Sequence, residues 1–156
     1  MAVQTQLSRQ GIMTPMPDDL PVQIYSAITG YVPGNAATDQ GTDPEQLFAW
    51  WAANPIAGYK LGTFTRINPA NVNAMRNAII NGGAYLCVEL AVEQQGQKEW
   101  KPAGTPGSWG GHAVWADTYE ADWLSVTSWG ECILVDDAYL SGGFGAAVFS
   151  LDLEAT

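Results

Sequence analysis

The spacing of hydrophobic residues changes near the middle of the chain, from a helical period to a strand period. In the first half, Asp43 is placed to cap a helix, Pro44 suits its first position, and the apolar residues that follow recur at helical spacing. This pattern predicts a helix over Pro44–Ala53, which ends ahead of Pro55 because a residue before proline leaves the helical region. The same period, followed by a pair of glycines, predicts a second helix over Asn71–Asn81.

From residue 84 onward the apolar residues alternate with more polar ones. The segment AYLCVELAV, residues 84–92, has this period of two and predicts a strand. The segments HAVWADTY (112–119) and DWLSVTSW (122–129) predict an antiparallel hairpin rich in aromatic residues. Further strands are predicted at Cys132–Val135 and Ala146–Leu151. Helices therefore come first and antiparallel strands later, which predicts the α+β class.

The first 21 residues, Met1–Pro21, show no periodic apolar pattern and contain three prolines. We expect an extended arm, which is either a floppy tail or a segment that becomes ordered on a neighbouring subunit. The following stretch, Val22–Tyr31, fits a strand or a short helix equally well. Residues 22–156 are then expected to form a single domain.

Composition and charge exclude several classes of function. Of 156 residues 47% are hydrophobic, and 16 acidic against 6 basic residues give a net charge of −10, which repels the phosphates of nucleic acids and anionic lipids. No apolar run approaches the roughly 20 residues of a membrane-spanning helix, and the start of the chain lacks the apolar middle of a secretory signal. One histidine and two cysteines form no metal-binding pattern, so we expect neither a metal nor a cofactor.

The negative charge is concentrated in the second half of the chain. From residue 102 to the end there are eight acidic residues and no lysine or arginine. This half is either a solvated face that keeps the protein in solution or an acidic docking surface for a basic partner.

The single histidine, His112, is the most informative residue in the chain. It follows Gly110 and Gly111 and lies across the predicted hairpin from Thr127 and Ser128. We expect the glycines to allow close approach of the backbone and to leave one side of the ring open, while the hairpin partner orients the ring. Whether Thr127 or Ser128 faces the ring depends on the register, because a slip of one residue exchanges them.

The residues around the hairpin are compatible with two other kinds of site. A serine-type triad with His112 is disfavoured because the neighbouring hydroxyls lie within a predicted strand, whereas such a nucleophile needs an exposed turn beside paired N–H donors. Four tryptophans cluster nearby and either pack into the core, which we favour, or line a groove for a carbohydrate or peptide. The candidate binding residues of such a groove are Trp109, Gly110, Gly111 and Trp129.

The segments Gly110–Val114 and Thr127–Gly130 resemble the papain-like cysteine peptidases, whose histidine begins an H-A-V strand and whose orienting asparagine stands in a following N-S-W-G. The stretch Met75–Gly83 is similar to the helix-to-strand junction of that family. More narrowly, the order of several short motifs is similar to small papain-like proteins encoded by bacteriophages. These motifs are Gly30–Pro33, Thr38–Gly41, the helix around Trp50, Ile56–Lys60 and Gly107–Val114. The resemblance covers roughly Val22–Leu153 and implies short helices followed by an antiparallel sheet or half-barrel.

The chain also departs from the family pattern at its catalytic positions. A papain-like peptidase places its nucleophilic cysteine at the start of a long, early helix, where the helix dipole and an imidazolium lower the pKa of the thiol. Here no cysteine precedes Cys87, and Cys87 and Cys132 fall in predicted strands, as core thiols do. The early glutamine of the family has no counterpart, and Thr127 replaces the orienting asparagine. The resemblance thus implies vestigial catalytic positions at His112 and Thr127, in a domain without the cysteine helix.

These features together predict a catalytically inactive papain-like scaffold or interaction module. The narrower resemblance implies an accessory or decoration component of a phage virion, with other protein subunits of a capsid or tail as partners. One alternative is a partial cysteine peptidase that a separate, cysteine-bearing chain completes. Another is a carbohydrate- or peptide-binding module that uses the tryptophan cluster.

Overall fold

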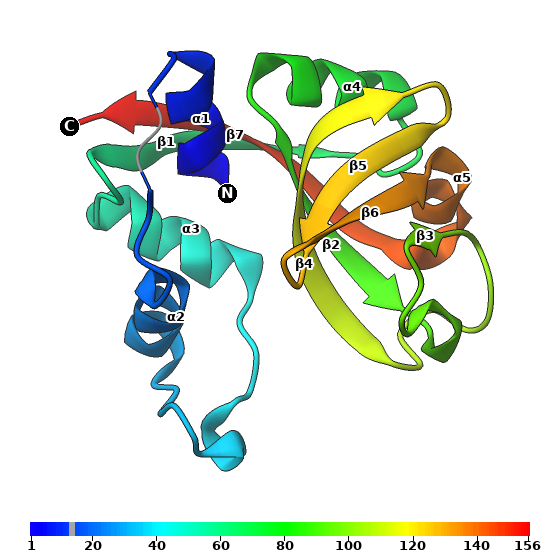
Figure 1. The fold of residues 1–156 in the computed structure, drawn as a ribbon, viewed down its shortest axis with the longest axis horizontal. Helices are drawn as coiled ribbons and strands as arrows, with labels where there is room; N and C mark the ends of the chain where they lie inside the picture. Colours follow the sequence, from blue (N-terminus) through cyan, green and yellow to red (C-terminus); the bar gives the residue numbers. More distant parts are fainter. Residues whose placement is uncertain (13–14) are drawn as a thin grey trace.

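The computed structural model describes residues 1–12 and 15–156, and it has a helical part beside a strongly curved sheet (Figure 1). Helix α3 has the predicted bounds, Pro44–Ala53, and Asp43 accepts the Glu45 N–H as its cap. Helix α4 spans Val72–Asn81 with Asn71 as its N-cap, which confirms the second predicted helix. Both helices begin where a side-chain acceptor meets the first free N–H groups.

Within the described ranges seven strands form one sheet, in the order β1-β7-β2-β4-β5-β6-β3. The bounds are β1 Tyr59–Ile67, β2 Ala84–Leu90, β3 Glu99–Trp100, β4 Gly110–Glu120, β5 Trp123–Ser128, β6 Glu131–Asp136 and β7 Gly145–Ala155. Neighbouring strands are antiparallel except β3 and β6, which are parallel. The five predicted strands correspond to β2, β4, β5, β6 and β7, whereas the hydrophobic pattern predicts neither β1 nor β3.

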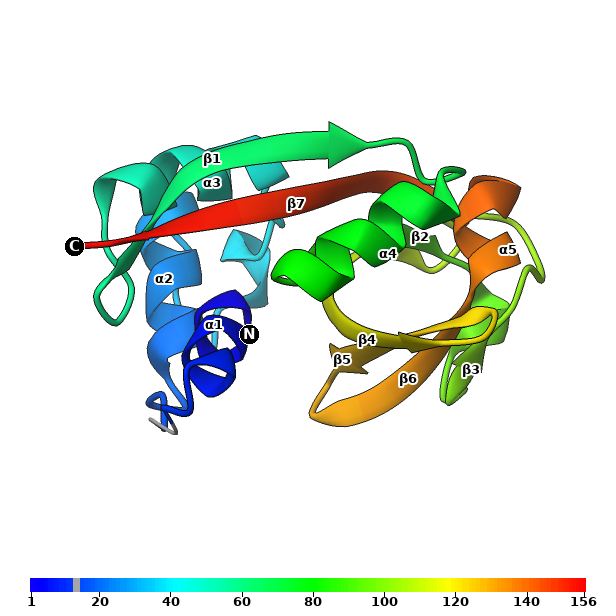
Figure 2. The same ribbon diagram turned by 90° about the horizontal axis from the view of Figure 1, so that it is seen from above.

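One face of the sheet, called here the inner face, covers the main hydrophobic core. Every second residue of β2 is buried there, as the period of two requires. Helix α4 packs against this face through Met75 and Ile79. The short helix α5, Asp137–Tyr139, continues into the π-type turn η3, Leu140–Phe144, and closes the other end of the core (Figure 2).

The opposite, outer face of the sheet packs against the helical part. Trp115, Phe149 and Leu61 meet Phe48 and Trp51 of α3 in a second buried cluster. Aromatic rings dominate this contact, so α3 is fixed by large apolar side chains rather than by polar ones. Two 3₁₀ turns lie in the connections, η1 over Ala36–Thr38 and η2 over Val92–Gln94.

The expectation of an extended arm over Met1–Pro21 is wrong for its first part. Ala2–Arg9 form helix α1, which buries Val3 and Leu7 in the second cluster. A helix this short leaves only one i, i+4 apolar pair, too little for the periodic pattern to be recognised. Residues 13–14 of the expected arm lie outside the described residues.

Helix α1 is held by residues far away in the sequence. The Arg9 guanidinium donates hydrogen bonds to the carbonyls of Ile79 and Ile80, at 2.6 and 2.8 Å, and so satisfies free acceptors at the end of α4. The Trp115 Nε1–H donates to Thr5 Oγ1 at 3.0 Å. The N-terminal segment is therefore part of the folded domain.

The stretch that fits strand or helix equally is helix α2, Leu20–Thr29, which ends at Gly30 with a φ of 76°. None of its residues is buried, although the helix is strongly apolar. It touches the rest of the chain mainly through α3. An apolar helix with no buried residue leaves hydrophobic surface without a partner in this chain.

Candidate functional site

His112 lies near the start of β4, opposite Val88 of β2, and its ring is on the inner face of the sheet. Its Nε2 atom is 2.8 Å from Ser128 Oγ on β5, so this pair forms the hydrogen bond that orients the ring. Thr127, the residue in the position of the orienting asparagine, does not make this contact. It pairs with Trp115, three residues beyond the histidine, and strand alternation therefore places it on the outer face.

Two tryptophan rings pack against the imidazole of His112. The Trp129 ring stacks on it, with centroids 4.4 Å apart and an angle of 9° between the planes. The Trp100 ring, which is fully buried on β3, meets it edge-on at 6.4 Å. Trp129 and Gly130 form the two-residue β5–β6 turn with φ values of 49° and 77°, an unusual conformation for tryptophan. The stack therefore holds Trp129 in place despite an unfavourable backbone.

The two glycines before His112 do not have the role expected from the sequence, which is to allow close backbone approach of a neighbouring segment. A Cβ built at Gly110 or Gly111 would meet no atom within 4 Å, so close approach of a neighbouring segment is not their role. Gly110 has a φ of 146°, which a side chain rarely adopts, and this explains its presence. Gly111 is exposed and, as the neighbour of His112 on β4, lies on the opposite face of the sheet from the imidazole ring.

The Trp109 and Trp129 side chains are on the surface, 39% and 61% exposed, with ring centroids 5.4 Å apart. The expectation that these tryptophans pack into the core therefore holds for Trp115, which is buried, but not for Trp109 and Trp129. Together with Gly110 and Gly111 they border the histidine, so the structure brings the candidate binding residues to one place. Sequence reasoning missed Trp100, because its strand is only two residues long.

The electrostatic state of His112 follows from its burial, which lowers its pKa below the ordinary value of 6.5. The ring is therefore neutral near pH 7. Depending on the tautomer, Nε2 accepts the proton of Ser128 or donates its own. Nδ1 makes no hydrogen bond to any described residue, so it is the ring atom left for an external group.

This pKa has a testable consequence for stability. Because the folded-state pKa is depressed, the unfolded chain binds a proton first as the pH falls below 6.5, and stability is lost from there down to the folded-state pKa. We expect the wild type to lose more free energy of unfolding between pH 7 and 5 than the His112→Gln variant does. Urea denaturation at several pH values measures both, and equal pH dependence in the two proteins would contradict a depressed pKa.

Both thiols of the chain lie away from the histidine. Cys87 is adjacent to Val88 on β2 and so points to the outer face, the opposite face from His112. Cys132 pairs with Thr127 and is on the outer face as well, where its Sγ is 3.0 Å from Ser125 Oγ. Burial also raises the pKa of Cys87 to about 11. Neither cysteine therefore forms a thiolate–imidazole pair in this chain.

The hydroxyl of Ser128 contacts His112, but its position does not suit a nucleophile. Its side chain is 4% exposed and its backbone is paired on β5, so a substrate carbonyl has no path to the oxygen. A serine nucleophile is normally displayed on a tight turn next to N–H donors. The contact to His112 thus orients the ring instead of activating a serine.

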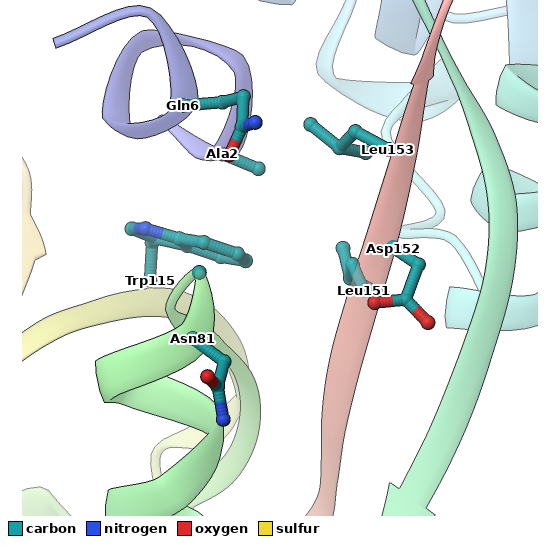
Figure 3. A pocket seen from close by; sticks show the side chains of 8 residues that line it. Ala2, Gln6, Asn81, Trp115, Leu151, Asp152 and Leu153 are labelled. Atoms are coloured by element: carbon teal, nitrogen blue, oxygen red, sulfur yellow. The ribbon is translucent and has the colours of Figure 1, made fainter. Parts of the chain in front are cut away.

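A groove of about 830 Å³ lies between the helices and the outer face of the sheet. Its walls come from α1, α2 and α3, and from β4 and β5 with Thr127 among the lining residues. A second, smaller cavity of about 150 Å³ separates α1 from the end of α4 and from β7 (Figure 3). Of these two cavities among the described residues, the groove is the one that reaches the size of a ligand site, about 300–1,000 Å³.

The described part of the chain contains neither the side-chain cluster of a metal site nor a helix long and apolar enough to cross a membrane. No three His, Cys, Asp or Glu side chains among residues 1–12 and 15–156 gather as metal ligands do. Across the same residues, every helix is too short or too polar to cross a bilayer.

The fold matches that of a known peptidase, although the sequence does not identify a family. No protein-family model and no curated protein matches the chain. Among solved structures, a cysteine protease of Carica candamarcensis called CMS1MS2, crystallised with E-64, superimposes with a TM-score of 0.59 at 14% identity. The match covers 92% of this chain and 95% of the protease chain. The chain therefore has a papain-like α+β fold, as the resemblance implies.

Proposed function

We propose that this papain-like chain is a catalytically inactive interaction module. The observation that carries the proposal is the placement of both thiols on the opposite sheet face from His112, which leaves the imidazole without a nucleophile in this chain. Acyl transfer by a cysteine peptidase needs the thiolate within hydrogen-bond reach of its histidine. A fold that keeps its shape without this pair is suited to binding other proteins.

The setting that we propose is the virion of a bacteriophage, where the chain acts as an accessory or decoration subunit on other capsid or tail proteins. The resemblance of several short motifs to those of small phage-encoded papain-like proteins is the reason for proposing this setting. The acidic second half of the chain supports attachment to a basic protein surface, because opposite charges increase the rate and specificity of association.

Covalent labelling tests the absence of catalysis. The chain is incubated at pH 7 with a peptidyl epoxide and, separately, with iodoacetamide, and the modified residues are identified by mass spectrometry. We expect no epoxide adduct, because at a pKa of about 11 only about one Cys87 side chain in 10⁴ is a thiolate at pH 7. We expect iodoacetamide to modify the exposed Cys132 equally in the wild type and in His112→Ala. Epoxide labelling that disappears in His112→Ala would overturn the proposal.

A second candidate function is a cysteine peptidase assembled from two chains. The observation that favours it is the orientation of His112: Nε2 is bound to Ser128, Trp129 covers the ring, and Nδ1 is free to receive a proton. A companion chain would then supply the cysteine. The same epoxide assay, repeated after mixing with a candidate companion, distinguishes the two functions, since only the two-chain peptidase gives His112-dependent labelling of the companion.

A further inference from the structure

The groove between the helices and the sheet is an open hydrophobic surface. Three apolar residues of α2 line it at successive turns, Leu20, Ile24 and Ile28. Trp51 of α3 and Trp115 of β4 line it from the other sides. None of the α2 residues is buried within this chain, so the helix presents its apolar side to a space that the chain does not fill.

The elements that line the groove indicate which secondary structure a bound protein segment would have. Strands β4 and β5, which form part of the sheet side of the groove, both have hydrogen-bonded neighbours on each side and offer no free edge for an added strand. The α2 side offers a ridge of residues four apart, and such ridges pack against the grooves of another helix. From Leu20 to Ile28 this ridge extends about 12 Å, or about two helical turns. A helix is therefore the element that fits.

The charge of an occupant follows from the residues around the groove. Asp18 lines it, and Asp39 accepts a hydrogen bond at 2.5 Å from Tyr25, which also lines it. Burial raises the pKa of the lining residue Tyr85, and the charge of nearby Asp43 adds to this rise. Among the residues that the structure describes, no lysine or arginine lines the groove, and the sequence from 10 to 59 contains five acids without a basic residue. The Met1 amino group also borders it, but burial lowers its pKa and weakens its positive charge.

We propose that this groove binds an amphipathic helix of another protein, with its apolar side inserted between α2 and β4 and with lysine or arginine residues toward Asp18, Asp39 and Asp43. This partner deepens, and rests on, the proposed role as an interaction module. A second copy of the chain does not fit this surface, because each copy carries a net charge of −10 and contributes no basic residue to the groove.

Selection from a displayed library of 14-residue helical peptides tests the proposal, with the wild-type chain as the target. We expect the enriched peptides to share an apolar face at i, i+3, i+4 and i+7 and to carry Lys or Arg beside it. Fluorescence anisotropy then compares their affinity for Ile24→Asp and for the matched control Val22→Asp, whose side chain is on the same helix but outside the groove. We expect Ile24→Asp to weaken binding at least tenfold and Val22→Asp to leave it unchanged.

Charge variants and folding controls complete the test. Asp18→Lys is expected to weaken binding about three- to tenfold at low salt, whereas Glu120→Lys, at the exposed end of β4, is expected to leave it unchanged. If thermal melting shows that Ile24→Asp is unfolded, Leu20→Asp takes its place. The proposed partner would be overturned if the selection enriched no peptide, or if the enriched peptides carried no basic residue. It would also be overturned if the peptides bound Ile24→Asp as tightly as Val22→Asp.

The peptide-binding test of the groove can fail or succeed independently of the labelling test of the proposed function. His112-dependent epoxide labelling of a chain with peptide bound would overturn catalytic inactivity while leaving the groove assignment in place. Equal binding to Ile24→Asp and Val22→Asp, without any labelling, would overturn the groove assignment alone.

Discussion

Replacing Phe48 with alanine is expected to lower the free energy of unfolding by about 3–5 kcal/mol, the usual cost of removing a buried phenylalanine ring. Phe48 is 1% exposed, and its ring contacts those of Phe64, Tyr85 and Phe149, with centroids 4.8, 5.6 and 5.1 Å away. These contacts fix α3 to the outer face of the sheet. Their loss leaves a cavity that the surrounding rings fill only in part.

Phe64→Ala is the matched control, because Phe64 belongs to the same aromatic contact but is 44% exposed. We expect this variant to lose about 1–2 kcal/mol, since part of its ring is already in water. Urea denaturation measures both variants against the wild type. Equal losses in the two would show that α3 is not held by the buried ring.

Gly83→Ala is expected to destabilise the chain by about 3 kcal/mol or more, through a steric clash and backbone strain together. A Cβ at this position would come within 2.2 Å of the Trp115 ring, and the backbone has a φ of 112°, where side chains are rarely tolerated. Trp115 would have to move, and with it the hydrogen bond from its Nε1–H to Thr5 that holds α1.

The adjacent glycine provides the control for this variant. Gly82 has a φ of 176°, which is ordinary extended backbone, and a Cβ there would approach only the Leu151 carbonyl oxygen, at 3.9 Å. Gly82→Ala is therefore expected to change the free energy of unfolding by no more than about 0.5 kcal/mol. Thermal or urea denaturation of the pair separates the clash at position 83 from a general intolerance of this turn. A comparable loss in both variants would contradict the assigned role of Trp115.

Elements with a local signal could be predicted from the sequence. Helix α3 follows from its capping Asp43, and strand β2 follows from strict alternation, because both signals lie within the element. Strand β1 gives a weak signal, since Leu61 is its single fully buried residue. Helix α1 is stabilised through Arg9 and Thr5 by residues 70 or more positions away, a distance over which no periodic pattern operates.

The candidate site could be predicted only in part. His112 was identifiable because a unique histidine stands beside glycines in a recognisable motif. The choice between Thr127 and Ser128 was not, because it depends on strand register, and a bulge between Ala116 and Thr118 shifts the pairing of β4 with β5. The groove could not be predicted from the sequence, because the residues that line it come from separate segments that meet only in the folded chain.

The position of β7 has a consequence for how the protein forms during synthesis. This strand, Gly145–Ala155, follows the other six described strands in the sequence, yet it lies between β1 and β2 in the interior of the sheet. Until β7 has been synthesised, β1 has no neighbour and one edge of β2 is open, so the nascent chain displays unpaired strand edges. We therefore expect removal of β7 to divide the sheet into two pieces and to be far more damaging than the loss of an edge strand.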